Sequence, residues 1–183
     1  NSIWDGKSAV GSMEAISSVT LSSSQSVVEF NNIPQTYSHL QLRYMAKNTT
    51  GTGTDQSLYI QFNGDTGSNY SWHRLYAYNP GNTVTADAST SQTQGFAGFI
   101  ITSASGLTNM FSKGVIDILD YTNTNKNKTV RSLAGDDGST TYGCVGLSSF
   151  LWFKSGTPAI TSMVLTTGNS FVANSVFTLY GIK

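Results

Sequence analysis

The chain has 183 residues and no formal net charge, and only 11% of its residues are charged, against about 25% in a typical soluble domain. This length is enough for one domain with a hydrophobic core. Such a neutral surface argues against nucleic-acid partners, whose phosphates need clustered Lys and Arg. No apolar run approaches the ~20 residues that cross a bilayer as a helix, so we expect no membrane insertion.

The composition favours β-structure. Ser, Thr, Asn and Gly take the place of Lys and Glu, and these residue types lower helix propensity. The aromatic fraction is 11%, and aromatic residues suit a pleated sheet. A single cysteine, Cys144, excludes an intrachain disulfide and is expected to be a small buried residue. The sequence therefore predicts an all-β fold, an antiparallel β-sandwich of jelly-roll type.

In chain order, we interpret residues 1–13 as an N-terminal arm or linker and 14–183 as the sandwich domain. Ile3 and Trp4 could anchor the arm on a neighbouring chain. Alternating apolar residues, separated by turn-forming residues, predict short strands. The predicted strands are Ile16–Leu21, Val27–Phe30, Leu40–Ala46, Leu58–Phe62, Trp72–Tyr78, Phe96–Ile101, Val115–Tyr121, Thr129–Leu133, Val145–Phe153, Ile160–Thr166 and Phe171–Ile182.

Two connections carry more specific expectations. The first two strands are predicted to form a hairpin across the turn at Ser22–Ser26. The segment Asn79–Gln94 is polar, with Pro80-Gly81 as a turn signal, and is predicted to be a surface loop.

The most informative stretch is Leu58–Tyr78, two strand patterns joined by a polar loop that contains glycine. Sugars bind to flat aromatic faces beside planar polar side chains, and this stretch supplies both. Simpler interpretations remain open: an Asx-turn at Asp65, a Ca²⁺ site on the loop oxygens, or a core or subunit-contact role for Trp72. The candidate ligand-binding residues are Asn63, Asp65, Asn69, Trp72, Arg74 and Tyr76.

Catalytic motifs are not evident. The sequence contains no phosphate-binding loop, no nucleophile elbow and no closed set of zinc ligands, so we expect no catalytic residue, metal or cofactor. A glycan-degrading enzyme would need two carboxylates about 5–9 Å apart across one cleft. Asp65, Asp117 and Asp136 are the candidates for that third possibility, although Asp117 could simply pair with Arg131 or Arg43 across strands.

Four runs resemble structural proteins of tailed bacteriophages of aquatic bacteria, cyanophages included: Val28–Arg43, Phe62–Tyr70, Ile116–Tyr121 and Phe177–Lys183. The resemblance covers roughly residues 13–183. It implies a virion component, either a tail fibre or appendage module or a capsid decoration protein, and it carries no catalytic residue to this chain. It also implies other virion proteins as partners and a homo-oligomer, a trimer being common in phage fibres.

The leading expectation is therefore a non-enzymatic virion structural protein on the particle exterior that contributes to host-surface adhesion. The alternative is a carbohydrate-binding module whose main role is to recognise a host surface glycan. In both cases the expected location is the virion, and the chemistry is binding rather than catalysis.

Overall fold

A computed structural model of the chain describes residues 12–51, 55–78, 83–104, 108–137 and 143–183. Residues 1–11 of the predicted arm at 1–13 and the turn at Pro80-Gly81 lie outside the described residues, whereas Met13 already begins the first strand. The described part is all-β, and its paired strands run antiparallel. The strands are β1 (Met13–Thr20), β2 (Gln25–Phe30), β3 (His39–Ala46), β4 (Asp55–Phe62), β5 (Tyr70–Tyr78), β6 (Thr83–Gln92), β7 (Gly95–Ile101), β8 (Ser112–Leu119), β9 (Lys128–Asp137), β10 (Gly143–Trp152), β11 (Met163–Phe171) and β12 (Val176–Ile182).

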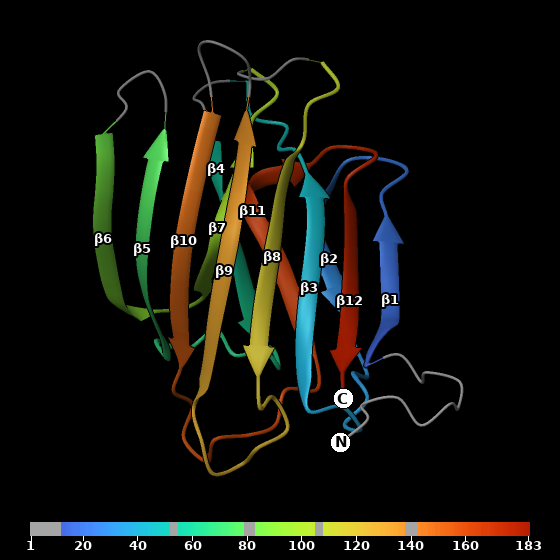
Figure 1. The fold of residues 1–183 in the computed structure, drawn as a ribbon, viewed down its shortest axis with the longest axis vertical. Coiled ribbons are helices and arrows are strands. Elements are labelled where there is room, and N and C mark those ends of the chain that lie inside the picture. The colour runs from blue at the N-terminus through green and yellow to red at the C-terminus, as the bar shows by residue number, and fades with distance from the viewer. Residues whose placement is uncertain (1–11, 52–54, 79–82, 105–107, 138–142) are drawn as a thin grey trace, which may run out of the picture.

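The strands form two sheets packed face to face, as Figure 1 shows. The large sheet has the order β1-β12-β3-β8-β9-β10-β5-β6, and the small sheet has the order β2-β11-β4-β7. Eight of these strands, β1-β12-β3-β8 over β2-β11-β4-β7, follow the alternating path of a jelly roll. The predicted β-sandwich of jelly-roll type is confirmed.

Two hairpins extend this jelly roll on one side. The β5–β6 hairpin is inserted between β4 and β7, and the β9–β10 hairpin is inserted between β8 and β11. Both join the large sheet beyond β8, on the left in Figure 1, so that the large sheet has twice as many strands as the small one. The candidate site residues on β5 therefore belong to this extension.

Strand alternation creates the core. On β3, the inward side chains Leu40, Leu42, Tyr44 and Ala46 are all buried, whereas residues between them are partly or fully exposed. The small sheet supplies matching inward residues such as Ile60. Cys144 is buried as predicted, and burial raises the pKa of its thiol to about 12, so the thiol stays protonated at neutral pH.

Glycines on the inner faces make room for aromatic rings. A Cβ on Gly114 of β8 would lie 2.4 Å from the Tyr44 ring, and one on Gly146 of β10 would lie 2.7 Å from the Phe99 ring of the opposite sheet. The Tyr44 hydroxyl donates to the Phe99 carbonyl at 3.2 Å. Aromatic rings therefore bridge the two sheets where neighbouring strands lack a side chain.

The prediction of a hairpin between the first two strands is wrong. β1 pairs with β12 in the large sheet, whereas β2 pairs with β11 in the small sheet. Between them, Leu21 is buried, its N–H donates to the Ser175 carbonyl at 2.9 Å, and its carbonyl accepts from the Asn174 N–H at 2.7 Å. This connection therefore crosses from the large sheet to the small sheet. Strand periodicity cannot indicate such a crossing, because the partner strands of β1 and β2 are distant in sequence.

The prediction of a surface loop over Asn79–Gln94 is also wrong, since its described part holds β6, an edge strand paired with β5. Small residues hid the alternation, because Thr85 and Asp87 face inward while Val84, Ala86 and Ala88 are exposed. At the C-terminus, the pattern over Phe171–Ile182 is divided: β11 ends at Phe171, and β12 begins at Val176. No helix in the described residues is long and apolar enough to cross a membrane.

Candidate functional site

Asp65, in the connection between β4 and β5, is the hub of a hydrogen-bond network. Its carboxylate accepts from the Trp152 indole at 2.7 Å, from the Asn69 amide at 2.9 Å, from the Gly67 N–H at 3.1 Å and from Lys154 Nζ at 3.1 Å. Burial alone would raise the pKa of Asp65, but these bonds outweigh it and lower the pKa to about 2. The network fastens the loop to the end of β10.

Asn63 has a similar role on the other side of this loop. Its amide donates to the Ala159 carbonyl at 2.7 Å, and its side-chain oxygen accepts from the backbone N–H groups of Thr161 and Ser162. The bond from the Gly67 N–H to Asp65 is the Asx-turn expected as the simpler interpretation. The hydrogen-bonding capacity of Asn63, Asp65 and Asn69 is thus largely used within the chain.

Trp72, Arg74 and Tyr76 lie at alternate positions on β5, so they share the inner face of the extension. The Arg74 guanidinium lies 4.9 Å from the Trp72 ring centre and 5.0 Å from that of Tyr76. It also forms a two-point ion pair with Asp87 of β6, at 2.5 and 2.7 Å. This pair raises the pKa of Arg74, chiefly through the hydrogen bonds with Asp87.

Beneath Arg74 lies a second, smaller core formed by Phe96, Phe99 and Cys144. Trp72 packs on Phe96 with ring centres 5.7 Å apart, and Tyr76 packs on Phe99 with ring centres 5.1 Å apart. The structure therefore brings together the three predicted site residues on β5, Trp72, Arg74 and Tyr76. They form a group separate from the Asp65 network. They join the hairpin β5–β6 to β7 of the small sheet.

The three candidate catalytic carboxylates do not share a cleft. Asp65 binds Trp152 at one end of β10, whereas Asp136 pairs with Cys144 near the other end. Eight residues of extended strand separate these ends by roughly 27 Å. Asp117 lies on the outer face of β8, beside Arg131 of β9, and accepts from Gln41 at 2.8 Å. Asp65 and Asp136 are therefore too far apart for a glycosidase pair within about 9 Å, and Asp117 lies five residues along the strands from Asp136 and on the opposite face of the sheet.

Metal ligands do not gather in the described residues either, since no group of three His, Cys, Asp or Glu side chains there could hold an ion. The expected absence of a metal site stays a prediction for the whole chain.

Asp136 is the one described residue with a buried side-chain oxygen that lacks a hydrogen-bond partner. Its other oxygen accepts from the Ser112 hydroxyl at 2.6 Å. Burial raises the pKa of Asp136, and the bonds from Ser112 and the Cys144 N–H offset this only in part. The ionised carboxylate is therefore disfavoured in the folded state.

Asp136→Asn is expected to stabilise the protein at pH 7 by on the order of 1 kcal/mol. A raised folded-state pKa gives stability below the unfolded pKa of about 4, and this stability is lost as pH rises through the folded value. The gain in stability of Asp136→Asn over wild type should therefore vanish near pH 4. Urea unfolding of both proteins at pH 4 and at pH 7 would show this. A variant less stable than wild type at pH 7 would contradict this interpretation.

The structure shows a surface that the sequence did not predict, on the outer face of the large sheet. Four apolar side chains form one row across neighbouring strands, each directly opposite the next: Leu75 of β5, Leu147 of β10, Leu133 of β9 and Val115 of β8. We call this row the apolar strip. Leu75, Leu147 and Leu133 are 48%, 54% and 56% exposed. All but Val115 lie on the inserted hairpins.

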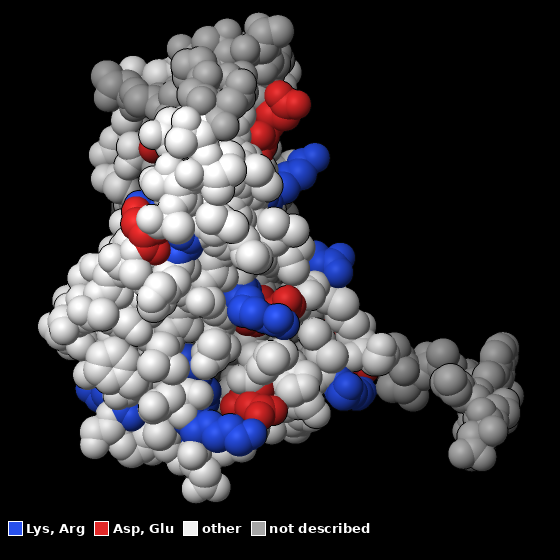
Figure 2. Space-filling model, turned by 60° about the vertical axis from the view of Figure 1, so that its left-hand side comes forward, with Lys and Arg blue, Asp and Glu red and all other residues white. Residues whose placement is uncertain are grey.

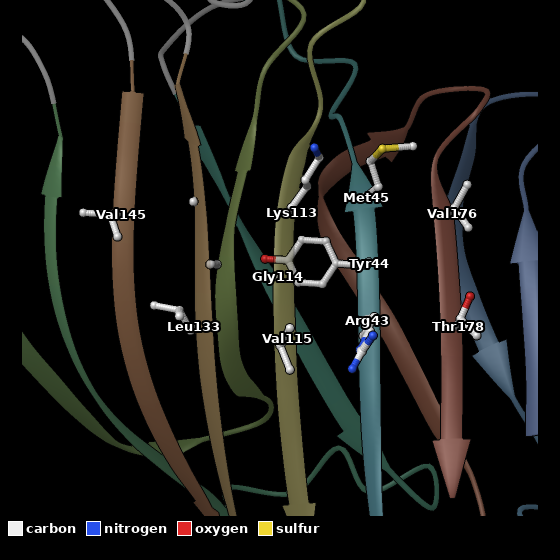
Figure 3. Close-up of a pocket in the computed structure, with 12 residues that line it drawn as sticks. Arg43, Tyr44, Met45, Lys113, Gly114, Val115, Leu133, Val145, Val176 and Thr178 are labelled. Atoms are coloured by element: carbon white, nitrogen blue, oxygen red, sulfur yellow. The ribbon is translucent and has the colours of Figure 1, made fainter. Parts of the chain in front are cut away.

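Shallow hollows lie on both sides of the apolar strip. One, of about 630 Å³, lies between Met45, Val115, Leu133 and Val145 and has Gly135 in its lining. Figure 3 shows these side chains on β3, β8, β9 and β10, with the Tyr44 ring extending toward Gly114. A second, of about 660 Å³, lies between Leu75, Leu147 and Arg131. The exposed apolar strip and the hollows beside it make this face a candidate protein interface.

A sequence signal for this surface existed. In β10, apolar residues occur at both alternating positions, since Val145 and Leu147 face outward while Phe150 and Trp152 face the core. Apolar residues on both faces indicate a strand covered on both sides.

The side of the molecule seen in Figure 2 carries its charged groups as small, separate patches between wide uncharged areas. This agrees with the low overall charge. Comparisons of the chain with protein-family models, with curated proteins and with solved structures returned no match. The candidate surface therefore rests on its own geometry.

Proposed function

We propose that this chain is a non-enzymatic structural protein of a phage virion, located on the particle exterior and held in an assembly through the outer face of its large sheet. The apolar strip is the observation that carries the proposal. Three large side chains, each about half exposed on adjacent strands, are unfavourable in water and favour burial against protein.

The fold and the resemblance to tailed-phage structural proteins support the same role. Jelly rolls recur in viral capsid and lectin domains, so the fold supports this role by analogy. The inserted hairpins carry most of the apolar strip, and their inner face is fixed by the Arg74–Asp87 pair and the smaller core. A rigid extension of this kind suits a scaffold.

Peptide mass spectrometry of purified particles from a phage that encodes the chain tests this proposal. We expect the protein to be present at a structural copy number, and labelled antibody to bind the particle exterior in electron micrographs. Absence of the protein from purified virions would overturn the assignment.

Glycan recognition is the second candidate, favoured by one observation. Tyr76 and Tyr78 stack with ring centres 5.8 Å apart and planes within 9°, and Tyr78 is 45% exposed. A flat exposed ring of this kind suits a sugar face. Glycan-array binding that is lost in Tyr78→Ala, with unfolding unchanged, would support this role, and the absence of any bound glycan would remove it.

A further inference from the structure

Two rows of side chains flank the apolar strip on the outer face of the large sheet. On one side, Val145 of β10, Gly135 of β9 and Lys113 of β8 lie opposite one another. On the other side, the same three strands present Ser149, Arg131 and Asp117. Each flanking row lies two residues from the apolar strip, about 6.8 Å along the strands.

We propose that the occupant of this face is a second copy of the chain, related by a two-fold axis that runs along the apolar strip between the two sheets. Rotation about that axis places each strand over its own counterpart, in the opposite direction. The apolar strip then lies against itself, with Leu133 on Leu133 and Leu147 on Leu147, and the two flanking rows exchange places. Such an interface is isologous.

Charge complementarity favours this partner. Lys113 and Asp117 lie on β8, one on each side of Val115, so the rotation brings Lys113 of each copy opposite Asp117 of the other. In the described part of the chain, Lys113 has no ion-pair partner. Two symmetric Lys113–Asp117 pairs fix the register and direction of the contact.

The size of the side chains is complementary as well. Arg131 of one copy comes opposite Gly135 of the other, which lines the first hollow. Arg43 lies at the end of the apolar strip, where two copies would bring like charges together. It is turned aside, because its Nε donates to Gln41 at 2.8 Å and its guanidinium lies 5.3 Å from the Tyr180 ring centre.

The area is adequate for a dimer. The contact covers five strands, from β6 to β8 in the sheet order, which are spaced about 4.8 Å apart. Its three rows are about 6.8 Å apart, so the two copies overlap over roughly 24 Å by 20 Å. The accessible surface buried by such an overlap is of the same order as the ~800 Å² per partner in standard interfaces. This inference does not depend on the virion proposal, because the contact needs only this chain.

A charge swap tests the pairing. Sedimentation velocity from about 1 to 100 µM should show wild type approaching twice the chain mass of 19.6 kDa. Lys113→Asp and Asp117→Lys should each weaken dimerisation by about tenfold or more, because like charges then face each other. The double variant K113D/D117K should return to within about fivefold of wild type. Unfolding midpoints of all four proteins check that each folds.

Cysteine cross-linking tests the same contact without altering the charges that lie in it. Leu147→Cys lies on the axis and should give a cross-linked dimer with a short bismaleimide, whereas Glu29→Cys, exposed on β2 of the small sheet, should not. Any one of five results would overturn the proposal. In sedimentation, these are a wild type that stays monomeric over the whole range, a trimer, a dimer unaffected by the single charge reversals, or a double variant that dimerises as weakly as the single ones. In cross-linking, the contradicting result is equal cross-linking at the two sites.

Discussion

Asp65→Ala is expected to destabilise the protein by about 3 to 5 kcal/mol, the range for removing one partner from a buried charged network. The substitution leaves the buried Trp152 indole N–H without its acceptor, which costs about 1–3 kcal/mol, and it removes the bonds that hold Asn69 and the exposed Gly67 N–H to the same carboxylate. Lys154, which is 43% exposed at its side chain, can return to water. Urea unfolding at pH 7 measures the loss.

Glu29→Ala is the matched control, since it removes an exposed carboxylate and should change stability by less than about 0.5 kcal/mol. The pH dependence gives a second check. The lowered pKa of Asp65 means that its contribution is present above the unfolded pKa of about 4 and is lost as pH falls through its folded value of about 2. Equal stabilities of the two variants at pH 7 would contradict the network's structural role.

Gly114→Ala is expected to cost about 3 kcal/mol, at the upper end of the usual range for overpacking a core. The new Cβ would lie 2.4 to 2.6 Å from three atoms of Tyr44. The ring has little space to move, because its hydroxyl bonds to Phe99 and lies close to Gly98 of the opposite sheet. Gly51→Ala is the control, as a Cβ there meets no atom within 4 Å. Thermal and urea unfolding measure both.

A double-mutant cycle isolates the cause. Tyr44→Ala alone should cost about 3 to 5 kcal/mol through the cavity it leaves. In that background, Gly114→Ala should cost far less, giving a coupling of about 2 kcal/mol or more between the two positions. An equal cost of Gly114→Ala in both backgrounds would show that the Tyr44 ring is not the obstacle.

The sequence predicted the fold class because inward and outward side chains alternate along most strands, as in Leu40–Ala46. It did not predict β6, whose small residues Ala86 and Ala88 give almost no contrast between faces. The first two strands were wrongly paired because a hairpin is the simplest local solution, whereas the actual partners, β12 and β11, lie more than a hundred residues away. Pairing between distant segments leaves no local pattern.

The candidate site shows a similar division. The sequence singled out the connection around Asp65 as an Asx-turn or a binding loop, but its loop composition could not show that Trp152 and Lys154, far along the chain, would bind that carboxylate. The apolar strip was missed because each of its members belongs to a different strand. Only the register between strands places Leu75, Leu133 and Leu147 in one row.

The most direct test of the proposed interface is hydroxyl-radical footprinting of the wild-type chain over a concentration series. If the outer face joins two copies, Leu75, Leu133 and Leu147 lose reactivity together as concentration rises. Phe153, which is 38% exposed beyond the end of β10, keeps its reactivity. Unchanged oxidation of the three leucines, at concentrations where the mass has doubled, would contradict the account.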